Sequence, residues 1–112
     1  MKRLLFLGII VMMALISCEK SHPDNGIPEC IESKIKELST SVLAGKDANV
    51  TEYRFQWKRV YLFDPAMCCD MPSPVFDSNC NYLGSLGGFA GNTMINGEDF
   101  SKAKFIKIIW HK

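Results

Sequence analysis

The chain has 112 residues, of which 47% are hydrophobic and 22% charged, and its formal net charge at pH 7 is +1. This length fits one small domain. The near-neutral balance argues against a nucleic-acid-binding protein, because such a protein needs a stripe of positive charge on its surface.

The first 17 residues have the pattern of a bacterial lipoprotein signal peptide. A short basic start precedes Leu4–Ile16, an apolar run that is too short to span a bilayer. Residues 15–18, LISC, then resemble a lipobox, in which Cys18 becomes the first mature residue and carries the lipid. Two or three acyl chains, palmitate among them, would anchor the protein stably. The alternative is an ordinary secretory signal with a chance cysteine.

The remaining 95 residues divide into a tether and a domain. They carry 11 basic and 12 acidic side chains, because Lys2 and Arg3 are lost from the 13 basic residues of the whole chain. Residues 18–26 are polar and rich in turn formers, which predicts a flexible tether. Residues 27–112 form the single predicted domain. A domain of this size buries only about 60–65% of its extended surface, so covalent cross-links would help it.

Four cysteines remain for such cross-links, and an oxidising compartment favours disulfides between them. Cys30, Cys68, Cys69 and Cys80 allow three connectivities. A bond between the neighbours Cys68 and Cys69 needs a strained ring and is ranked last. We therefore expect Cys30 to pair with one of these two and Cys80 with the other, in loops of about 40 and about 12 residues that contribute about 4 and about 3 kcal/mol.

Residues 27–43 predict an amino-terminal helix. Pro28 suits its first turn and Gly45 follows as a stop. Apolar side chains recur at helical spacing and would face a sheet. They are Ile31, Ile35, Leu38 and Val42.

The next residues predict the start of a small, mainly antiparallel sheet. Residues 50–57 alternate between apolar and polar side chains, and residues 59–63 are rich in aromatic and branched side chains. Together they predict a β-hairpin that turns at residues 56–58. Short strands are expected at residues 75–77 and 82–83, on either side of a turn.

The last third of the domain is predicted less regularly. Gly84–Asn92 contains four glycines in nine residues and is expected to be an irregular surface loop, and Asn96–Asp99 a turn. Phe100–Lys112 favours a final strand, although Ala103, Ile106 and Trp110 also fit helical spacing. The predicted fold class is therefore α+β: one amino-terminal helix packed on a small antiparallel sheet, held by disulfides.

Two motifs could carry chemistry. Asp77, Asn79 and Asn81 match the first half of a calcium loop, but Tyr82 and Gly88 stand where such a loop needs glycine and glutamate. We therefore favour an Asx-rich turn. The Cys68–Cys69 pair could be a redox or soft-metal site.

The sequence offers neither further metal ligands nor a histidine base near Cys68 and Cys69. The two histidines, His22 and His111, lie in the tether and at the end of the chain. Zinc needs four ligands, and a cysteine nucleophile needs a histidine base. Structural disulfides are favoured, with no catalytic residue, metal or cofactor expected.

A basic and aromatic hairpin is the candidate contact surface. Its basic side chains Arg54, Lys58 and Arg59 alternate with aromatic ones. Trp57 and Arg59 here, or Phe89 in the glycine-rich loop, could bind a protein or a glycan. The alternative for the aromatic side chains is packing within the sheet.

The domain resembles a known family over residues 27–112. The motifs on which this resemblance rests are CCD at residues 68–70, FDSNCN at residues 76–81 and GGFAG at residues 87–91. They are similar to a family of small lipoproteins from Bacteroidota described as a domain of unknown function. Family members often carry a further cysteine and a proline where this chain has Gly84–Leu86, so the disulfide set can differ. The resemblance implies an envelope location and no activity.

We expect a non-enzymatic module of the cell envelope. Lipid at Cys18 would attach it to a membrane, expected to be the outer membrane on its periplasmic or surface face, and its partner would be a protein or a glycan. The alternative is a small envelope redox or thiol protein that uses Cys68 and Cys69. No nucleic-acid partner is expected.

Overall fold

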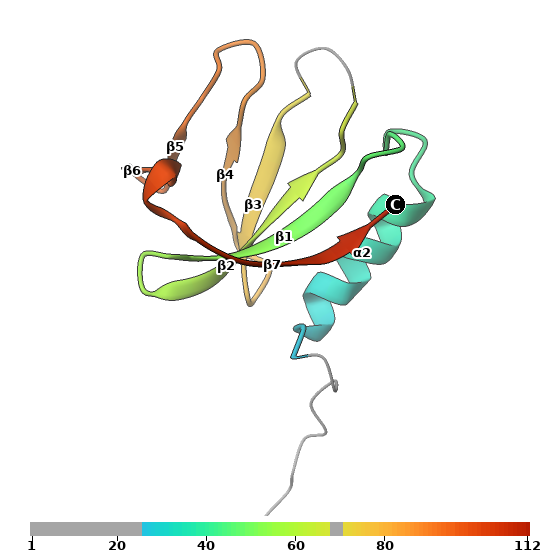
Figure 1. Ribbon diagram of the computed structural model, residues 1–112, viewed down its shortest axis with the longest axis horizontal. Helices are drawn as coiled ribbons and strands as arrows, with labels where there is room; N and C mark the ends of the chain where they lie inside the picture. The colour runs from blue at the N-terminus through green and yellow to red at the C-terminus, as the bar shows by residue number, and fades with distance from the viewer. Residues whose placement is uncertain (1–25, 68–70) are drawn as a thin grey trace, which may run out of the picture.

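The computed structural model describes residues 26–67 and 71–112, and it places one helix against an antiparallel sheet (Figure 1). The helix is α2 (Glu29–Thr40), and the sheet has five strands in the order β4-β3-β2-β1-β7. The α+β prediction is confirmed. The strands of the sheet are β1 (Asn49–Phe55), β2 (Lys58–Asp64), β3 (Ser73–Asp77), β4 (Tyr82–Leu86) and β7 (Lys104–His111). Between β4 and β7 lie β5 (Met94–Ile95), β6 (Glu98–Asp99) and the 3-10 helix η2 (Phe100–Lys102).

Helix α2 begins two residues later and ends three residues earlier than predicted. It starts directly after Pro28, with acidic side chains in the first turn that suit the positive end of the helix dipole. At the other end, the hydroxyls of Ser39 and Thr40 donate to the carbonyl of Lys36, at 2.7 and 3.2 Å. The predicted extension to residue 43 is wrong, and Val42 lies beyond the helix with 93% of its surface exposed.

The helix covers one face of the sheet. Ile31 is fully buried there, and Ile35 and Leu38 pack on the same cluster, so this part of the predicted apolar stripe is confirmed. The sheet contributes Val50, Tyr61 and Phe63. The opposite face has its own cluster, which packs under the β4–β7 connection. Its buried members are Phe55, Val60, Val75 and Ile95.

The predicted hairpin is confirmed, and the predicted final strand is confirmed over Lys104–His111, whereas Phe100–Lys102 form a 3-10 helix. Strands β1 and β2 pair from Asn49↔Asp64 to Phe55↔Lys58, which leaves a turn of two residues. Residues 104–111 form a strand rather than a helix. Two expectations are wrong. Residues 84–86 are the end of β4, and only the residues after them form a loop, closed by a bridge between Gly87 and Asn92. Of the predicted turn at residues 96–99, Glu98–Asp99 form strand β6, which pairs with β5.

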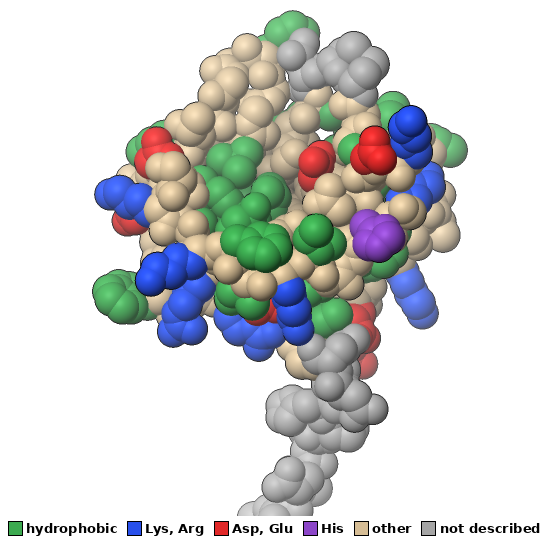
Figure 2. All heavy atoms as spheres, in the orientation of Figure 1, with side chains coloured by type: hydrophobic (Ala, Val, Ile, Leu, Met, Phe, Trp, Pro, Cys, Tyr) green, Lys and Arg blue, Asp and Glu red, His purple; other side chains and the backbone are tan. Residues whose placement is uncertain are grey.

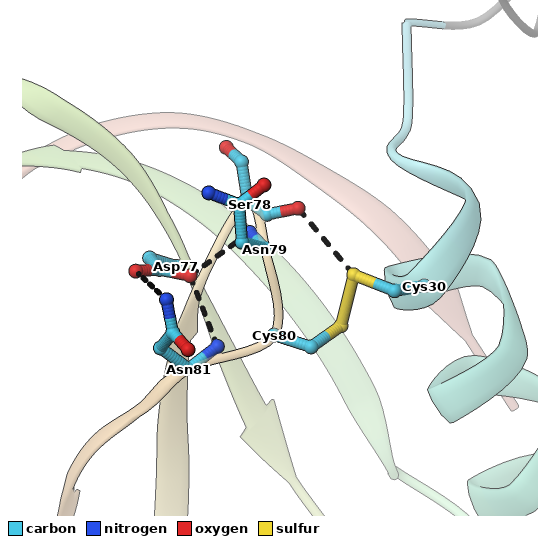
Figure 3. Close-up of a disulfide and its surroundings, with 6 residues drawn as sticks. All are labelled: Cys30, Asp77, Ser78, Asn79, Cys80 and Asn81. Carbon is cyan, nitrogen blue, oxygen red and sulfur yellow. Dashed lines mark hydrogen bonds between the residues drawn. A yellow bond between two sulfur atoms is a disulfide. The ribbon is translucent and has the colours of Figure 1, made fainter.

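The disulfide connectivity differs from the expected one. Cys30 bonds to Cys80, with 6.1 Å between their Cα atoms, so neither of the two favoured pairings of these cysteines is correct (Figure 3). The bond joins the first turn of α2 to the β3–β4 turn, because α2 begins at the end of the sheet where that turn lies (Figure 1). Cys68 and Cys69 lie outside the described residues, as do Cys18 and the predicted signal peptide.

No helix within residues 26–67 and 71–112 is long and apolar enough to cross a membrane.

Candidate functional site

The structure separates the three predicted contact residues. In this antiparallel meander, the β1–β2 and β3–β4 turns lie at one end of the sheet and the β4–β5 connection extends from the other end (Figure 1). Trp57 is at the first end and 94% exposed, whereas Phe89, 96% exposed, lies in the β4–β5 connection. Arg59 lies within β2. These residues therefore do not form one surface.

Arg59 is a structural residue. Its guanidinium donates two hydrogen bonds to the Glu52 carboxylate, both at 3.1 Å, and a third to the carbonyl of Gly26 at 2.9 Å. Glu52 is only 3% exposed, so Arg59 provides its counter-charge inside the protein. The hydrogen bond with Glu52 raises the pKa of Arg59, against the opposing effect of burial. A guanidinium held in this way has little freedom to bind a partner.

Trp57 sits in a turn of unusual composition. It and Gln56 form the whole β1–β2 turn, and their φ angles are 65° and 51°. A two-residue turn with two positive φ angles fits the twist of a hairpin, but it usually takes Asn-Gly because other side chains are strained there. This strained turn holds the indole away from the core.

A second hairpin braces this turn. Asn96 and Gly97 connect β5 to β6, again with two positive φ angles, of 48° and 81°. The Asn96 side-chain amide donates to Gln56 Oε1 at 2.7 Å, and the Gln56 amide donates to the Asn96 carbonyl oxygen at 3.1 Å. Because the two turns hold each other, the position of Trp57 is fixed from outside its own hairpin.

A cleft of about 560 Å³ opens beside the two turns, and we call it the tip cleft. It runs from the end of β1 to η2 and the start of β7, where Figure 2 shows Lys and Arg side chains gathered. Three of its residues are basic and one is acidic. Its lining is Arg54, Phe55, Gln56, Trp57, Glu98, Lys102 and Lys104.

Part of this lining was predicted from the sequence. Arg54 belonged to the predicted basic and aromatic hairpin, but Lys102 and Lys104 were missed. The available signal was a pair of lysines two residues apart at the start of the last strand. Their link to Trp57 depends on the sheet order, in which β7 lies beside β1.

A second hollow, of about 450 Å³, lies on the face of the sheet away from α2. Tyr53, Leu62 and Phe100 make it largely apolar, and Figure 2 shows hydrophobic side chains gathered in this region between β4 and β7. Its acidic member, Asp99, accepts a hydrogen bond from the backbone of Ser101 at 2.8 Å and so caps η2. Its other fixed polar side chain, Asn92, donates to the carbonyl oxygens of Ser85 and Met94, so the polar groups of this hollow are engaged within the protein.

The Asp77 region is an Asx-rich turn, as favoured. The carboxylate of Asp77 accepts hydrogen bonds from the backbone amides of Asn79 and Asn81, at 2.9 and 3.0 Å, and from the Asn81 side chain at 3.0 Å (Figure 3). Partial burial alone would raise the pKa of Asp77, but these hydrogen bonds outweigh it and lower the pKa. Over the described part of the chain, no three His, Cys, Asp or Glu side chains are placed to hold a metal ion.

Comparison with known proteins gives a family without an activity. The model of the family described as "Domain of unknown function (DUF6970)" matches residues 36–112, which is more than half of the chain. No curated protein and no solved structure matches the chain.

Proposed function

The chain belongs to the DUF6970 family, whose description assigns no function, and we propose that it is a lipid-anchored cell-envelope protein that binds a glycan at the tip cleft. It is a non-enzymatic module in this proposal. The single observation that carries it is Trp57, whose indole is 94% exposed on a strained turn that a second hairpin holds in place.

The exposure of Trp57 favours binding over packing as the role of this aromatic side chain in the hairpin. Its aromatic neighbours are packed: Phe55 is 2% exposed and Tyr61 is 0% exposed, and the ring of Tyr53 lies edge-on to Phe100 with 5.0 Å between centroids. Trp57 alone of these four turns its ring to solvent. Strain of this kind in a backbone clusters at functional positions, and an exposed flat ring can stack on the apolar face of a sugar.

The envelope part of the proposal rests on the lipobox-like sequence at residues 15–18 and on the disulfide. A disulfide between Cys30 and Cys80 fits a protein that folds outside the cytosol. The test is the mass of the amino-terminal peptide from cells that express the whole chain, which should begin at Cys18 and carry acyl groups. Cys18→Ser should move the protein from the membrane fraction to the soluble fraction. An unmodified Cys18 in a membrane-free protein would reject the anchor.

The binding part is tested on the whole chain in detergent. The purified protein is applied to an array of defined neutral and acidic oligosaccharides, and hits are measured by calorimetry. Trp57→Ala should weaken binding about tenfold or more, as expected for an aromatic anchor. Phe89→Ala is the matched control, because Phe89 is equally exposed but lies in the β4–β5 connection. Equal affinity of the Trp57 variant and the parent would reject the tip cleft as the site.

The observed disulfide also favours a second candidate. Both favoured connectivities paired Cys68 and Cys69 with Cys30 and Cys80. Because Cys30 is bonded to Cys80, neither is available to Cys68 or Cys69. A thiol or redox role of Cys68 and Cys69 is therefore the alternative function. Mass spectrometry of non-reduced, alkylated protein tests this role. Two alkylated thiols at these positions would support it, and a second disulfide that resists mild reduction would reject it.

A further inference from the structure

The cations of the tip cleft form no salt bridge within the described part of the protein, although the carboxylate of Asp99 lies near enough to Lys102 for a charge interaction. Over residues 26–67 and 71–112, the salt bridge that the structure contains joins Arg59 to Glu52, and Arg54, Lys102 and Lys104 have no carboxylate oxygen within 4.0 Å. Glu98 is the acidic residue of the cleft lining. The cleft therefore carries an excess of positive charge in a protein whose basic and acidic residues nearly balance.

The strand register makes this excess unfavourable for the fold. Arg54 lies directly opposite Arg59 on β2 and directly opposite Lys104 on β7. Like charges at directly opposite positions of neighbouring strands repel and destabilise a sheet. Glu52 offsets the charge of Arg59, but the repulsion between Arg54 and Lys104 is left in place. A bound anion would relieve it.

The cleft combines this charge with enough room for a small ligand and with an exposed aromatic side chain. Its volume, about 560 Å³, lies within the range of small-ligand sites, and the Trp57 ring stands at its margin. An acidic protein partner would be expected to bury an apolar centre of several side chains with its charges at the rim. The exposed apolar side chains of β7, Phe105, Ile106 and Ile108, do not line the cleft. Its lining holds one exposed ring, that of Trp57, together with three cations, which suits a sugar ring with an acidic substituent.

From the charge, register and lining together, we propose that the tip cleft binds an acidic oligosaccharide. Trp57 stacks on a sugar ring while Arg54, Lys102 and Lys104 bind its carboxylate, sulfate or phosphate groups. This inference rests on the proposed function and adds the class of ligand to it.

The experiment compares sugars that differ in charge. The whole chain in detergent is titrated with an oligogalacturonate and with its methyl-esterified form, which keeps the sugar backbone and removes the charge. Dextran sulfate and dextran form a second pair, and poly-glutamate tests for an acidic polypeptide. Each titration is repeated from about 0.01 to about 0.5 M salt, over which screening removes most charge attraction between exposed groups.

Two double variants separate the cleft from general positive charge. Lys102→Glu with Lys104→Glu reverses the cleft, and Lys36→Glu with Lys46→Glu makes the same change at exposed lysines on α2 and in the loop after it. The melting temperature is recorded for each. Lys104→Glu places a carboxylate opposite Arg54 and should raise stability, whereas Lys102→Glu removes a charge attraction to Asp99. The melting temperature therefore shows whether a loss of binding reflects unfolding.

The expected result is binding of at least one acidic saccharide about tenfold or more tighter than its neutral counterpart, weakened by salt, lost in the cleft variant and kept in the control. If the neutral forms bind equally and Trp57→Ala abolishes both, the proposed function stands and the acidic class is wrong. If the control variant loses binding as strongly as the cleft variant, the attraction is non-specific and the inference fails. Binding of poly-glutamate alone, or of none of the probes, also overturns it.

Discussion

The carboxylate of Glu52 and the guanidinium of Arg59 form a two-point contact between β1 and β2, with both N–O distances at 3.1 Å. The two residues are diagonal neighbours in the hairpin, since Glu52 lies opposite Tyr61 and Arg59 opposite Arg54. The contact neutralises a carboxylate that is 3% exposed.

Arg59→Met should therefore lower the free energy of unfolding by about 2–3 kcal/mol, because it leaves the Glu52 carboxylate buried and unpaired. This is less than the 3–5 kcal/mol of a fully buried pair, since Arg59 is itself 41% exposed. Urea unfolding measures the change. Adding Glu52→Gln to this variant should restore much of the loss. No recovery in the double variant would show that the two side chains act independently.

Trp57→Gly and Trp57→Ala should differ in stability and have the same effect on binding. Both remove the indole. Only glycine tolerates the φ angle of 65° without strain, so Trp57→Gly should raise the free energy of unfolding by about 1 kcal/mol relative to Trp57→Ala. Urea midpoints and oligosaccharide titrations measure the two properties. If the alanine variant proves the more stable of the two, the turn is not strained in the protein.

Removing the cross-link should destabilise the domain strongly. Cys30→Ser with Cys80→Ser opens a loop with a sequence separation of 50, which corresponds to about 4 kcal/mol in the chain-entropy model. Unfolding by urea under non-reducing conditions measures the loss. A peptide map should show Cys30 linked to Cys80 in the parent protein, and a map that links either of them to Cys68 or Cys69 would contradict the structure.

Asp77 should make the domain sensitive to acid. Its pKa is lowered in the folded state, so its contribution to stability is complete above the ordinary value of 3.8 and is lost as the pH falls through the lower folded value. In Asp77→Asn this part of the pH dependence should disappear, with a loss of about 1 kcal/mol at neutral pH. Unfolding midpoints between about pH 2 and about pH 7 check it, with the exposed Asp47→Asn as control. Parallel curves for parent and Asp77→Asn would remove Asp77 as the cause.

Local patterns in the sequence predicted the elements, because they depend on neighbours in the chain. The spacing of Ile31, Ile35 and Leu38 gave the helix face, and alternation gave the hairpin and the last strand. Glycine content was a poorer guide: residues 84–86 continue β4 because the edge of a sheet tolerates Gly84 where its backbone approaches Ile95.

Features that join distant segments could not be predicted in the same way. Gln56 and Asn96 are 40 residues apart, and no local signal shows that their turns meet. The pairing of Cys30 with Cys80 depends on α2 beginning at the end of the sheet where the β3–β4 turn lies. The excess charge of the tip cleft likewise depends on β7 lying beside β1, which brings Lys104 opposite Arg54.

The hydrogen bond from Arg59 to Gly26 has a consequence for the distance between the cleft and a membrane. Gly26, Arg59, Arg54 and Lys104 form one continuous row across the end of the domain. Cys18 is eight residues before Gly26, a span of at most about 28 Å when fully extended. With Cys18 lipidated as proposed, the tether therefore limits the distance between the tip cleft and the bilayer surface. The ligand of the cleft would have to come from the membrane surface or reach down to it.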